Sequence, residues 1–258
     1  MPPEATRPET SDGLLKILWR DAWLCAIDKP CGLMVHRSNK GTDTRFALQL
    51  LRDQLGQRVW PLHRLDRATS GLLLFALDEA TAAAMGQQMM DRRISKRYLA
   101  VVRGHIDQAG LIDHPLQADG RGSARTARTD YRCLARMELP FTVGRYPSAR
   151  YSLIEAMPRT GRMHQIRRHL KHIFHPVIGD TTYGEGRHNR LFRELFVCHR
   201  LLLHASNLSF EHPHQGQTIH LTSPLTGSFR RIAGEFIHRD CFFTNREDAK
   251  HAKKSNDS

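Results

Sequence analysis

The stretch HRLDRATSG, His63 to Gly71, places a single carboxylate between cations. Asp66 follows Arg64 by two residues and directly precedes Arg67. Neighbouring positive charges favour the ionised form of a carboxylate, so Asp66 is suited to attack as an anion and poorly suited to donate a proton. A structural alternative is that Asp66, which precedes two hydroxyl residues, holds a turn or caps a helix. The local sequence leaves both interpretations open.

Two further residues could share a site with this acid. Tyr98 lies in SKRYLA, and Arg167 lies in TGRMHQIRRHL. A carboxylate, an aromatic ring and a guanidinium are the groups that an enzyme needs to stack a flipped-out base while an anion attacks nearby. Taken singly, Tyr98 is more typical of a half-buried strand, and Arg167 is more typical of a helix surface.

The elements that must position these residues mix hairpins with helices. Apolar periodicity and turn residues predict a strand pair at 14–20 and 23–28, strands at 71–77, 95–106, 201–212 and 217–222, and a strand-rich region at 125–157. Helices are predicted at 44–55, 78–93, 164–174 and 224–237. The absence of regular strand–helix alternation favours an α+β fold around a mixed sheet.

Charge is the strongest global signal. The 258 residues contain 39 Lys and Arg against 26 Asp and Glu, a formal net charge of +13. This excess favours a polyanionic partner, and nucleic acid is preferred over a membrane surface because no basic amphipathic helix or lipidation motif is evident. The Arg-rich segment 121–136, with Arg125 and Arg128, is the candidate phosphate-binding stretch. A solvated charged strand face is the alternative.

Composition also predicts the character of the two ends of the chain and the compartment in which the protein acts. Residues 1–12 and 246–258 are polar and lack periodicity, so we expect disordered tails around one domain spanning 13–245. The N-terminus does not resemble a signal peptide, and no apolar stretch is long enough to span a bilayer. Five scattered cysteines without CxxC pairs suit reduced thiols. We expect a cytoplasmic protein that does not bind membranes.

Metal and nucleotide sites are disfavoured. The densest histidine run, HQIRRHLKHIFH, has cationic neighbours and no HExxH motif or acidic third ligand. The glycines of GDTTYGEG lack the GK[ST] of a phosphate-binding loop. We therefore expect no metal ion and no nucleotide hydrolysis.

Six blocks of the sequence together carry a family resemblance: KPCGLMVH, HRLDRATSG, KRY, TGRMHQIRRHL, HPVIGDTTYG and LLLHA. In this order they resemble the RluA family of pseudouridine synthases, over nearly the whole chain outside the tails. The resemblance implies a mixed, mainly antiparallel sheet flanked by helices, with a central RNA-binding cleft. It also implies activity without a metal or organic cofactor.

The resemblance assigns roles by position. Asp66 matches the catalytic aspartate and Arg167 the arginine paired with it. Tyr98 matches the tyrosine that stacks on the base, and Arg64 the residue that enters the space vacated by the flipped base. Two apolar residues are expected to pack near the base: Ile166 and Leu203.

The implied reaction is isomerisation of uridine to pseudouridine in RNA. Asp66 would either attack covalently or remove a ribose proton to give a glycal, and the sequence leaves both routes open. The C-terminal half is most similar to the type of this family that acts at position 65 of tRNA. We expect a monomer that captures tRNA through the catalytic domain, including residues 121–136. The alternatives are a ribosomal RNA synthase of the same family, a non-catalytic RNA-binding protein and a base-excising glycosylase.

Overall fold

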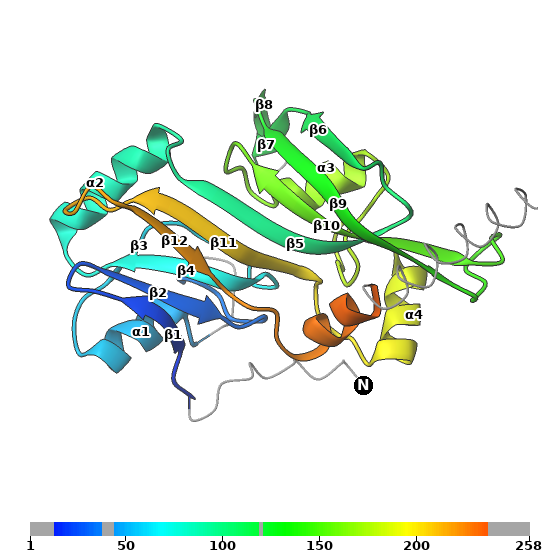
Figure 1. The fold of residues 1–258 in the computed structure, drawn as a ribbon, viewed down its shortest axis with the longest axis horizontal. Helices are drawn as coiled ribbons and strands as arrows, with labels where there is room; N and C mark the ends of the chain where they lie inside the picture. The colour runs from blue at the N-terminus through cyan, green and yellow to red at the C-terminus, as the bar shows by residue number, and fades with distance from the viewer. Residues whose placement is uncertain (1–12, 38–43, 119–120, 237–258) are drawn as a thin grey trace, which may run out of the picture.

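The computed structural model describes residues 13–37, 44–118 and 121–236 (Figure 1). Within them the main strands are β1 (Lys16–Arg20), β2 (Leu24–Lys29), β3 (Trp60–Pro61), β4 (Ser70–Ala76), β5 (Ser95–Arg103), β6 (Ala109–Asp113), β9 (Arg128–Leu139), β10 (Ala149–Pro158), β11 (Leu203–Glu211) and β12 (Thr218–Thr222). These form one sheet in the order β1-β2-β4-β11-β5-β10-β9-β6, with β3 paired to β4 and β12 to β11. A separate hairpin joins β7 (Leu116–Ala118) to β8 (Arg121–Arg125).

The described helices are α1 (Ala47–Leu55), α2 (Glu79–Met90), α3 (Gln165–His172) and α4 (Gly186–Phe196), and residues 227–236 form a further helical segment. Asp78 caps α2 by accepting the main-chain N–H of Thr81 at 2.8 Å, which satisfies one of the amides left unpaired at a helix start. The expected α+β fold with a mixed, mainly antiparallel sheet is confirmed. No helix in the described ranges is long and apolar enough to cross a membrane.

The burial patterns of β4 and β9 agree with their places in the sheet. All seven residues of β4, SGLLLFA, are buried, as expected for a strand covered on both faces. Buried and less buried residues alternate along β9, which places one face of that strand against the core. Two hydrophobic clusters result, one around β2, β4 and α1 and another joining β10 to α4 and the 227–236 helix.

One parallel pair sets the position of the loop that precedes β4. Among the pairings of the named strands, β4 and β11 alone run parallel, through Ser70 beside His204 and Gly71 beside Ala205. Gly71 has φ of +106°, and a Cβ there would lie 2.3 Å from the carbonyl oxygen of Ala205. A residue without a side chain is therefore required for the backbones to approach this closely. The start of β4 is fixed beside β11 and β5.

The structure adds elements that the sequence did not reveal. Helix α4 occupies a stretch left without an element, and β6 and the β7–β8 hairpin were not anticipated. The α4 helix starts at Gly186 after Glu185, whose side chain makes no capping hydrogen bond, so the usual start signals are missing. The tails expected at 1–12 and 246–258 lie outside the described residues.

Candidate active site

Asp66 lies in the loop between β3 and β4, and its carboxylate lines a cleft of about 1050 Å³. About a quarter of the side chain, 24%, remains exposed. The residue does form a turn, but through its main-chain oxygen, which accepts the N–H of Thr69 at 3.1 Å. The carboxylate oxygens instead face Arg167 and His164. This arrangement favours the chemical interpretation of Asp66 over the capping one.

A second loop, residues 29–33, holds the Asp66 loop by its main chain. The N–H of Gly32 donates to the carbonyl oxygen of Arg67 at 2.9 Å. The fully buried ammonium of Lys29 donates to the carbonyl oxygens of Leu33 at 2.8 Å and of Arg67 at 3.3 Å. Burial lowers the pKa of Lys29 to about 7. Lys29 therefore ties the two loops together from inside the core.

Arg167 joins two carboxylates. Its Nη1 donates to Oδ2 of Asp66 at 3.2 Å, while Nε and Nη2 donate to the two oxygens of Asp180 at 2.7 and 2.8 Å. The side chain of Asp180 has no exposed area, and that of Arg167 is 7% exposed. A two-point arginine–carboxylate contact fixes orientation as well as charge. The guanidinium is thus held by Asp180 and presented to Asp66.

Asp180 is itself stabilised as an anion. Burial alone would raise the pKa of its carboxyl, but hydrogen bonds from Arg167 and from the main-chain amides of Tyr183 and Thr182 hold that pKa below its usual value. The ring of Tyr183 also lies under the guanidinium of Arg167, 5.0 Å from its centre. The 180–183 turn therefore holds the guanidinium of Arg167 in place through Asp180 and Tyr183.

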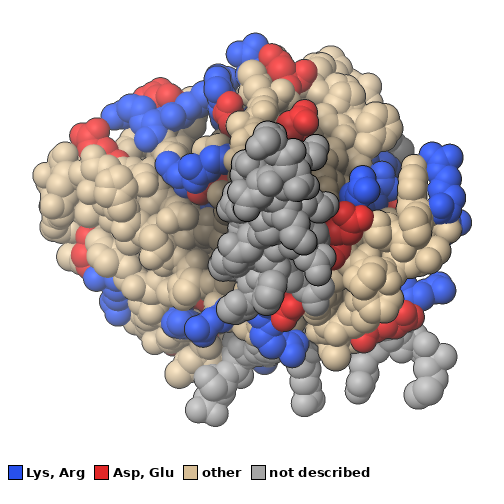
Figure 2. All heavy atoms as spheres, turned by 45° about the vertical axis from the view of Figure 1, so that its right-hand side comes forward, with Lys and Arg blue, Asp and Glu red and all other residues tan. Residues whose placement is uncertain are grey.

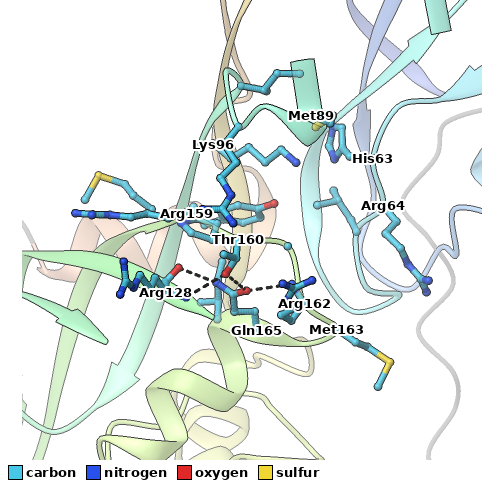
Figure 3. A pocket seen from close by; sticks show the side chains of 18 of the residues that line it. His63, Arg64, Met89, Lys96, Arg128, Arg159, Thr160, Arg162, Met163 and Gln165 are labelled. Carbon is cyan, nitrogen blue, oxygen red and sulfur yellow. Dashed lines mark hydrogen bonds between the residues drawn. The ribbon is translucent and has the colours of Figure 1, made fainter. Parts of the chain in front are cut away.

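Gln165 fixes the start of α3, from which Arg167 projects. Its Oε1 accepts hydrogen bonds from the hydroxyl of Thr160 at 2.7 Å and the N–H of Arg162 at 3.0 Å, and its Nε2 donates to the carbonyl oxygen of Arg128 at 2.9 Å (Figure 3). The preceding residue, His164, has the left-handed φ of 54°. The turn before α3 is therefore cross-linked to β9, which limits the movement of the helix start.

Tyr98 and two apolar residues line the same cleft as Asp66. Tyr98 lies on β5, directly opposite Ala205 of β11, and is 9% exposed. Burial, with the charge of Asp66, raises the pKa of its phenol, so the hydroxyl stays neutral. Ile166 and Leu203 are buried and belong to the lining. The cleft thus has an aromatic and apolar wall beside an anion.

The candidate RNA-binding arginines lie at different depths. Arg128 and Arg64 both line the cleft, and Arg64 is exposed, with its side chain extending away from the other labelled side chains (Figure 3). Arg125, on β8, is exposed and lies outside the lining. The structure therefore brings Arg128 and Arg64, but not Arg125, to the cleft that holds Asp66.

Other cations surround the cleft. The lining includes Arg92, Arg93, Lys96, Arg159 and Arg162. Burial lowers the pKa of the Lys96 ammonium to about 8. Elsewhere the charges are mixed, since Figure 2 shows Lys and Arg interspersed with Asp and Glu on one face of the molecule. The cleft itself therefore gathers positive charge suited to a phosphate backbone.

Comparison with known proteins shows the family of this chain. A family model described as RNA pseudouridylate synthase matches residues 24–172. The chain belongs to this family of RNA pseudouridylate synthases. Asp66, Tyr98, Ile166 and Arg167 all lie inside the matched range, and Leu203 and Asp180 lie beyond it.

Individual RNA pseudouridylate synthases are similar to this chain over most of its length. The chain is 43% identical over 243 residues to a tRNA pseudouridine synthase C of Vibrio cholerae, covering 90% of this chain and 100% of the relative. It is 46% identical over 232 residues to the protein of that name from Haemophilus ducreyi, covering 86% and 96%. The solved structure of human RNA pseudouridylate synthase domain containing 1 superposes with a TM-score of 0.67 at 27% identity, covering 85% of this chain and 86% of that one.

Sequence reasoning missed three residues of this candidate site: His164, Gln165 and Asp180. His164 and Gln165 lie in the block that contains Arg167, and Asp180 lies in HPVIGDTTYG. Their membership of these blocks is the feature of the sequence that could have identified them. Among the described residues, no group of three or more His, Cys, Asp or Glu side chains is placed to hold a metal ion.

Proposed function

We propose that this protein isomerises uridine to pseudouridine at position 65 of tRNA, with Asp66 as the reacting acid. The observation that carries the proposal is the Asp66 carboxylate, held at 3.2 Å by a buried Arg167 in a cleft that Tyr98 also lines. In the reaction the bond from C1′ to N1 breaks, the uracil turns, and a bond from C1′ to C5 forms. No atoms are gained or lost.

Each side chain of the cleft has a part in this proposal. Asp66 attacks C1′ or removes a ribose proton, and Arg167 orients its carboxylate through the 3.2 Å hydrogen bond. Tyr98 stacks on the flipped base against the apolar wall of Ile166 and Leu203. Arg64, exposed at the cleft, fills the space that the base leaves in the RNA.

The phosphate backbone is assigned to cations at and beside the cleft. Arg128 reaches the lining, and Arg125 extends the basic surface along β8. Arg128 already has a partner, because its Nε lies 2.8 Å from Oδ2 of Asp113, and both side chains are about half exposed, at 48% and 44%. An exposed ion pair of this kind contributes little to stability, so Arg128 can leave Asp113 and bind a phosphate with little loss of free energy.

A base-excising hydrolase is less well supported by the site. A glycoside hydrolase uses a second carboxyl group, as an acid or as a base that activates water. Asp130 also lines the cleft, but Arg159 donates two hydrogen bonds to its oxygens at 2.5 and 2.7 Å. Arg159 therefore occupies both carboxylate oxygens of Asp130. Asp66 is therefore the acid of the cleft that is open to a nucleotide.

The choice of tRNA rests on the relatives. Those of Vibrio cholerae and Haemophilus ducreyi, both named tRNA pseudouridine synthase C, align along 86% or more of this chain. A uridine in a folded tRNA arm is stacked, and extruding it costs a few kcal/mol, which Tyr98 stacking offsets. The proposal includes action as a cytoplasmic monomer, in keeping with the four described cysteines, which are all free thiols.

The test has two parts. Purified protein is incubated with tRNA, and the nucleosides are identified by mass spectrometry: pseudouridine is expected, an abasic site would indicate a glycosylase, and unchanged RNA would indicate a binding protein. Pseudouridine is then mapped at single-nucleotide resolution in tRNA and ribosomal RNA from cells with and without the protein. Loss at position 65 of tRNA is expected, and loss confined to ribosomal RNA would contradict the substrate assignment.

A further inference from the structure

His164 stands beside Asp66 with its two ring nitrogens in different surroundings. Nε2 lies 3.8 Å from Oδ1 of Asp66, and Nδ1 lies 3.0 Å from the hydroxyl oxygen of Tyr183. The ring lines the cleft, and 28% of the side chain is exposed. Tyr183 therefore fixes one nitrogen and leaves the other at the cleft. Each oxygen of Asp66 has its own neighbour, His164 at Oδ1 and Arg167 at Oδ2.

The backbone at His164 is set for this orientation. Its φ of 54° and ψ of 26° are left-handed, a conformation that costs a non-glycine residue roughly 1 kcal/mol. The N–H of Arg168 donates to the carbonyl oxygen of His164 at 2.9 Å and ties the residue to the first turn of α3. The left-handed residue and the Tyr183 contact together hold the ring in the cleft.

The reaction of the proposed function, on which this inference rests, has a proton to move. When C5 of the freed uracil bonds to C1′, C5 still carries its hydrogen and N1 carries none. The C5–H bond must then break, its electron pair forming the C5–C6 double bond, while the electrons of the N1–C6 double bond take up a proton at N1. One group that first accepts and then donates a proton completes this transfer without any net change.

We infer that His164 is a further catalytic residue of this centre: its imidazole takes the proton from C5 and returns a proton to N1. A histidine suits this task because one ring nitrogen accepts a proton while the imidazolium remains acidic enough to give it up near neutral pH. In the tautomer whose proton lies on Nδ1, that nitrogen donates to the hydroxyl oxygen of Tyr183, and the lone pair of Nε2 faces the cleft on the side where Asp66 meets the nucleotide.

The other titratable groups near Asp66 fit the task less well. The phenol of Tyr98 has a raised pKa, through burial and the charge of Asp66, and does not act as a base near neutral pH. Arg167 stays protonated. Nε2 of His63 already accepts the N–H of Leu74 at 3.2 Å, and its Nδ1 is buried. Lys96, with a pKa lowered by burial to about 8, is mainly an ammonium at pH 7 and a weaker candidate for the base.

The charges facing His164 come from three elements. Asp66 lies on the β3–β4 loop, Arg167 and Arg168 on α3, and Asp180 on the turn that also carries Tyr183. Burial lowers the pKa of the imidazole below its usual 6.5, and the charge of Asp66 opposes that shift without cancelling it. The ring is therefore neutral at pH 7. Its basic form is lost as the pH falls through its pKa, so turnover limited by this step decreases on the acid side.

The experiment uses the full chain and tRNA carrying tritium at C5 of uridine, because release of tritium reports the breaking of the C5–H bond. His164→Gly suits the left-handed backbone and leaves space for free imidazole. His172→Gln is the matched control, since His172 is exposed at the end of α3 and lies outside the cleft lining. Tritium release is followed from about pH 5 to pH 8, across the range in which histidine titrates, with and without imidazole.

For His164→Gly we expect tritium release at least about 100-fold slower than in the wild type, the usual effect of removing an acid–base group. The acid-side decrease should vanish, and added imidazole should restore release in proportion to its neutral form. Undiminished release, or a loss that imidazole does not restore, would overturn the inference. The same follows if the acid-side decrease persists in the variant, since Lys96 or another group would then carry the proton. His172→Gln should remain within about twofold of the wild type, as expected for a surface change.

Failure of the inference and failure of the proposed function are separable. If the wild-type protein forms pseudouridine and His164→Gly does so at the same rate, the inference alone is wrong. If the wild-type protein forms none, the proposed function is wrong and takes the inference with it. Circular dichroism of each variant establishes that the fold is retained.

Discussion

Arg167 binds Asp180 more closely than it binds Asp66: two hydrogen bonds of 2.7 and 2.8 Å join it to Asp180, and one of 3.2 Å joins it to Asp66. The buried Asp180 neutralises the guanidinium, so Arg167 is oriented before any nucleotide arrives. Asp66, with 24% of its side chain exposed, keeps one oxygen only loosely contacted, at 3.8 Å from His164. The Asp66 carboxylate is thus held by Arg167 while one of its oxygens stays open to the cleft.

Removing Arg167 should damage stability more than removing the charge of Asp66. Arg167→Met leaves the fully buried Asp180 without its partner, and breaking a buried pair in this way costs about 3–5 kcal/mol. Asp66→Asn removes only the longer contact, and we expect it to cost about 1 kcal/mol or less. Urea denaturation of both variants checks this order. Equal losses of unfolding free energy in the two variants would contradict the claim that the contact of Arg167 with Asp180 stabilises the fold more than its contact with Asp66.

Asp180 should also give the protein a distinct dependence on pH. Its folded-state pKa is below the unfolded value of 3.8, because hydrogen bonds from Arg167 and the main-chain amides of Tyr183 and Thr182 outweigh burial. Its contribution to stability is therefore complete above about pH 4 and is lost as the pH falls through the lower, folded-state value. Asp180→Asn should be less stable than the wild type at pH 7, and the difference should narrow in acid. A difference that stays constant from pH 7 into strong acid would refute this role.

Tyr98 should act mainly through its ring. Tyr98→Phe keeps the aromatic surface that lines the cleft, and we expect kcat/KM to stay within about tenfold of the wild type. Tyr98→Leu removes stacking worth about 1–3 kcal/mol per base and should lower kcat/KM more strongly. Steady-state kinetics on tRNA compares the two. If Tyr98→Phe were as inactive as Tyr98→Leu, the hydroxyl rather than the ring would be essential.

The sequence predicted residues that line the cleft better than it predicted the residues that hold them in place. Asp66, Tyr98, Ile166, Arg167 and Leu203 come from four separate blocks, and all of them line one cleft. Their recognition rested on family resemblance, because taken singly Asp66 is typical of a turn, Tyr98 of a half-buried strand and Arg167 of a helix surface.

The parts that escaped prediction depend on long-range contacts. Arg167 and Asp180 are 13 residues apart in the sequence. Asp180 also accepts main-chain hydrogen bonds in its own turn, and no local pattern shows that a turn-forming aspartate is buried beside an arginine. His164 was seen only as part of a histidine run, and its left-handed backbone is visible only in the structure. Helix α4 starts at Gly186, and the preceding Glu185 makes no side-chain capping hydrogen bond. The sequence therefore lacks the usual signal for the start of this helix.

Binding to RNA should be strongly salt-dependent if the cations of the cleft contact phosphates. With about 6 phosphate contacts, the affinity should fall roughly a thousandfold between 50 and 200 mM salt, because bound counterions are released from the RNA. Titration of labelled tRNA at several salt concentrations measures the slope. Arg128→Gln should reduce that slope by about one contact. An affinity independent of salt would exclude binding dominated by the basic cleft.

The central claim is that the charge of Asp66 carries out the reaction. Asp66→Asn preserves the shape of the side chain and removes that charge, and the control Asp53→Asn changes an exposed carboxylate on α1. Each variant is incubated with tRNA, and pseudouridine is measured by mass spectrometry of the nucleosides, alongside tRNA binding. We expect Asp66→Asn to bind tRNA and form no pseudouridine, while Asp53→Asn matches the wild type. Pseudouridine formation by Asp66→Asn at close to the wild-type rate would contradict the account.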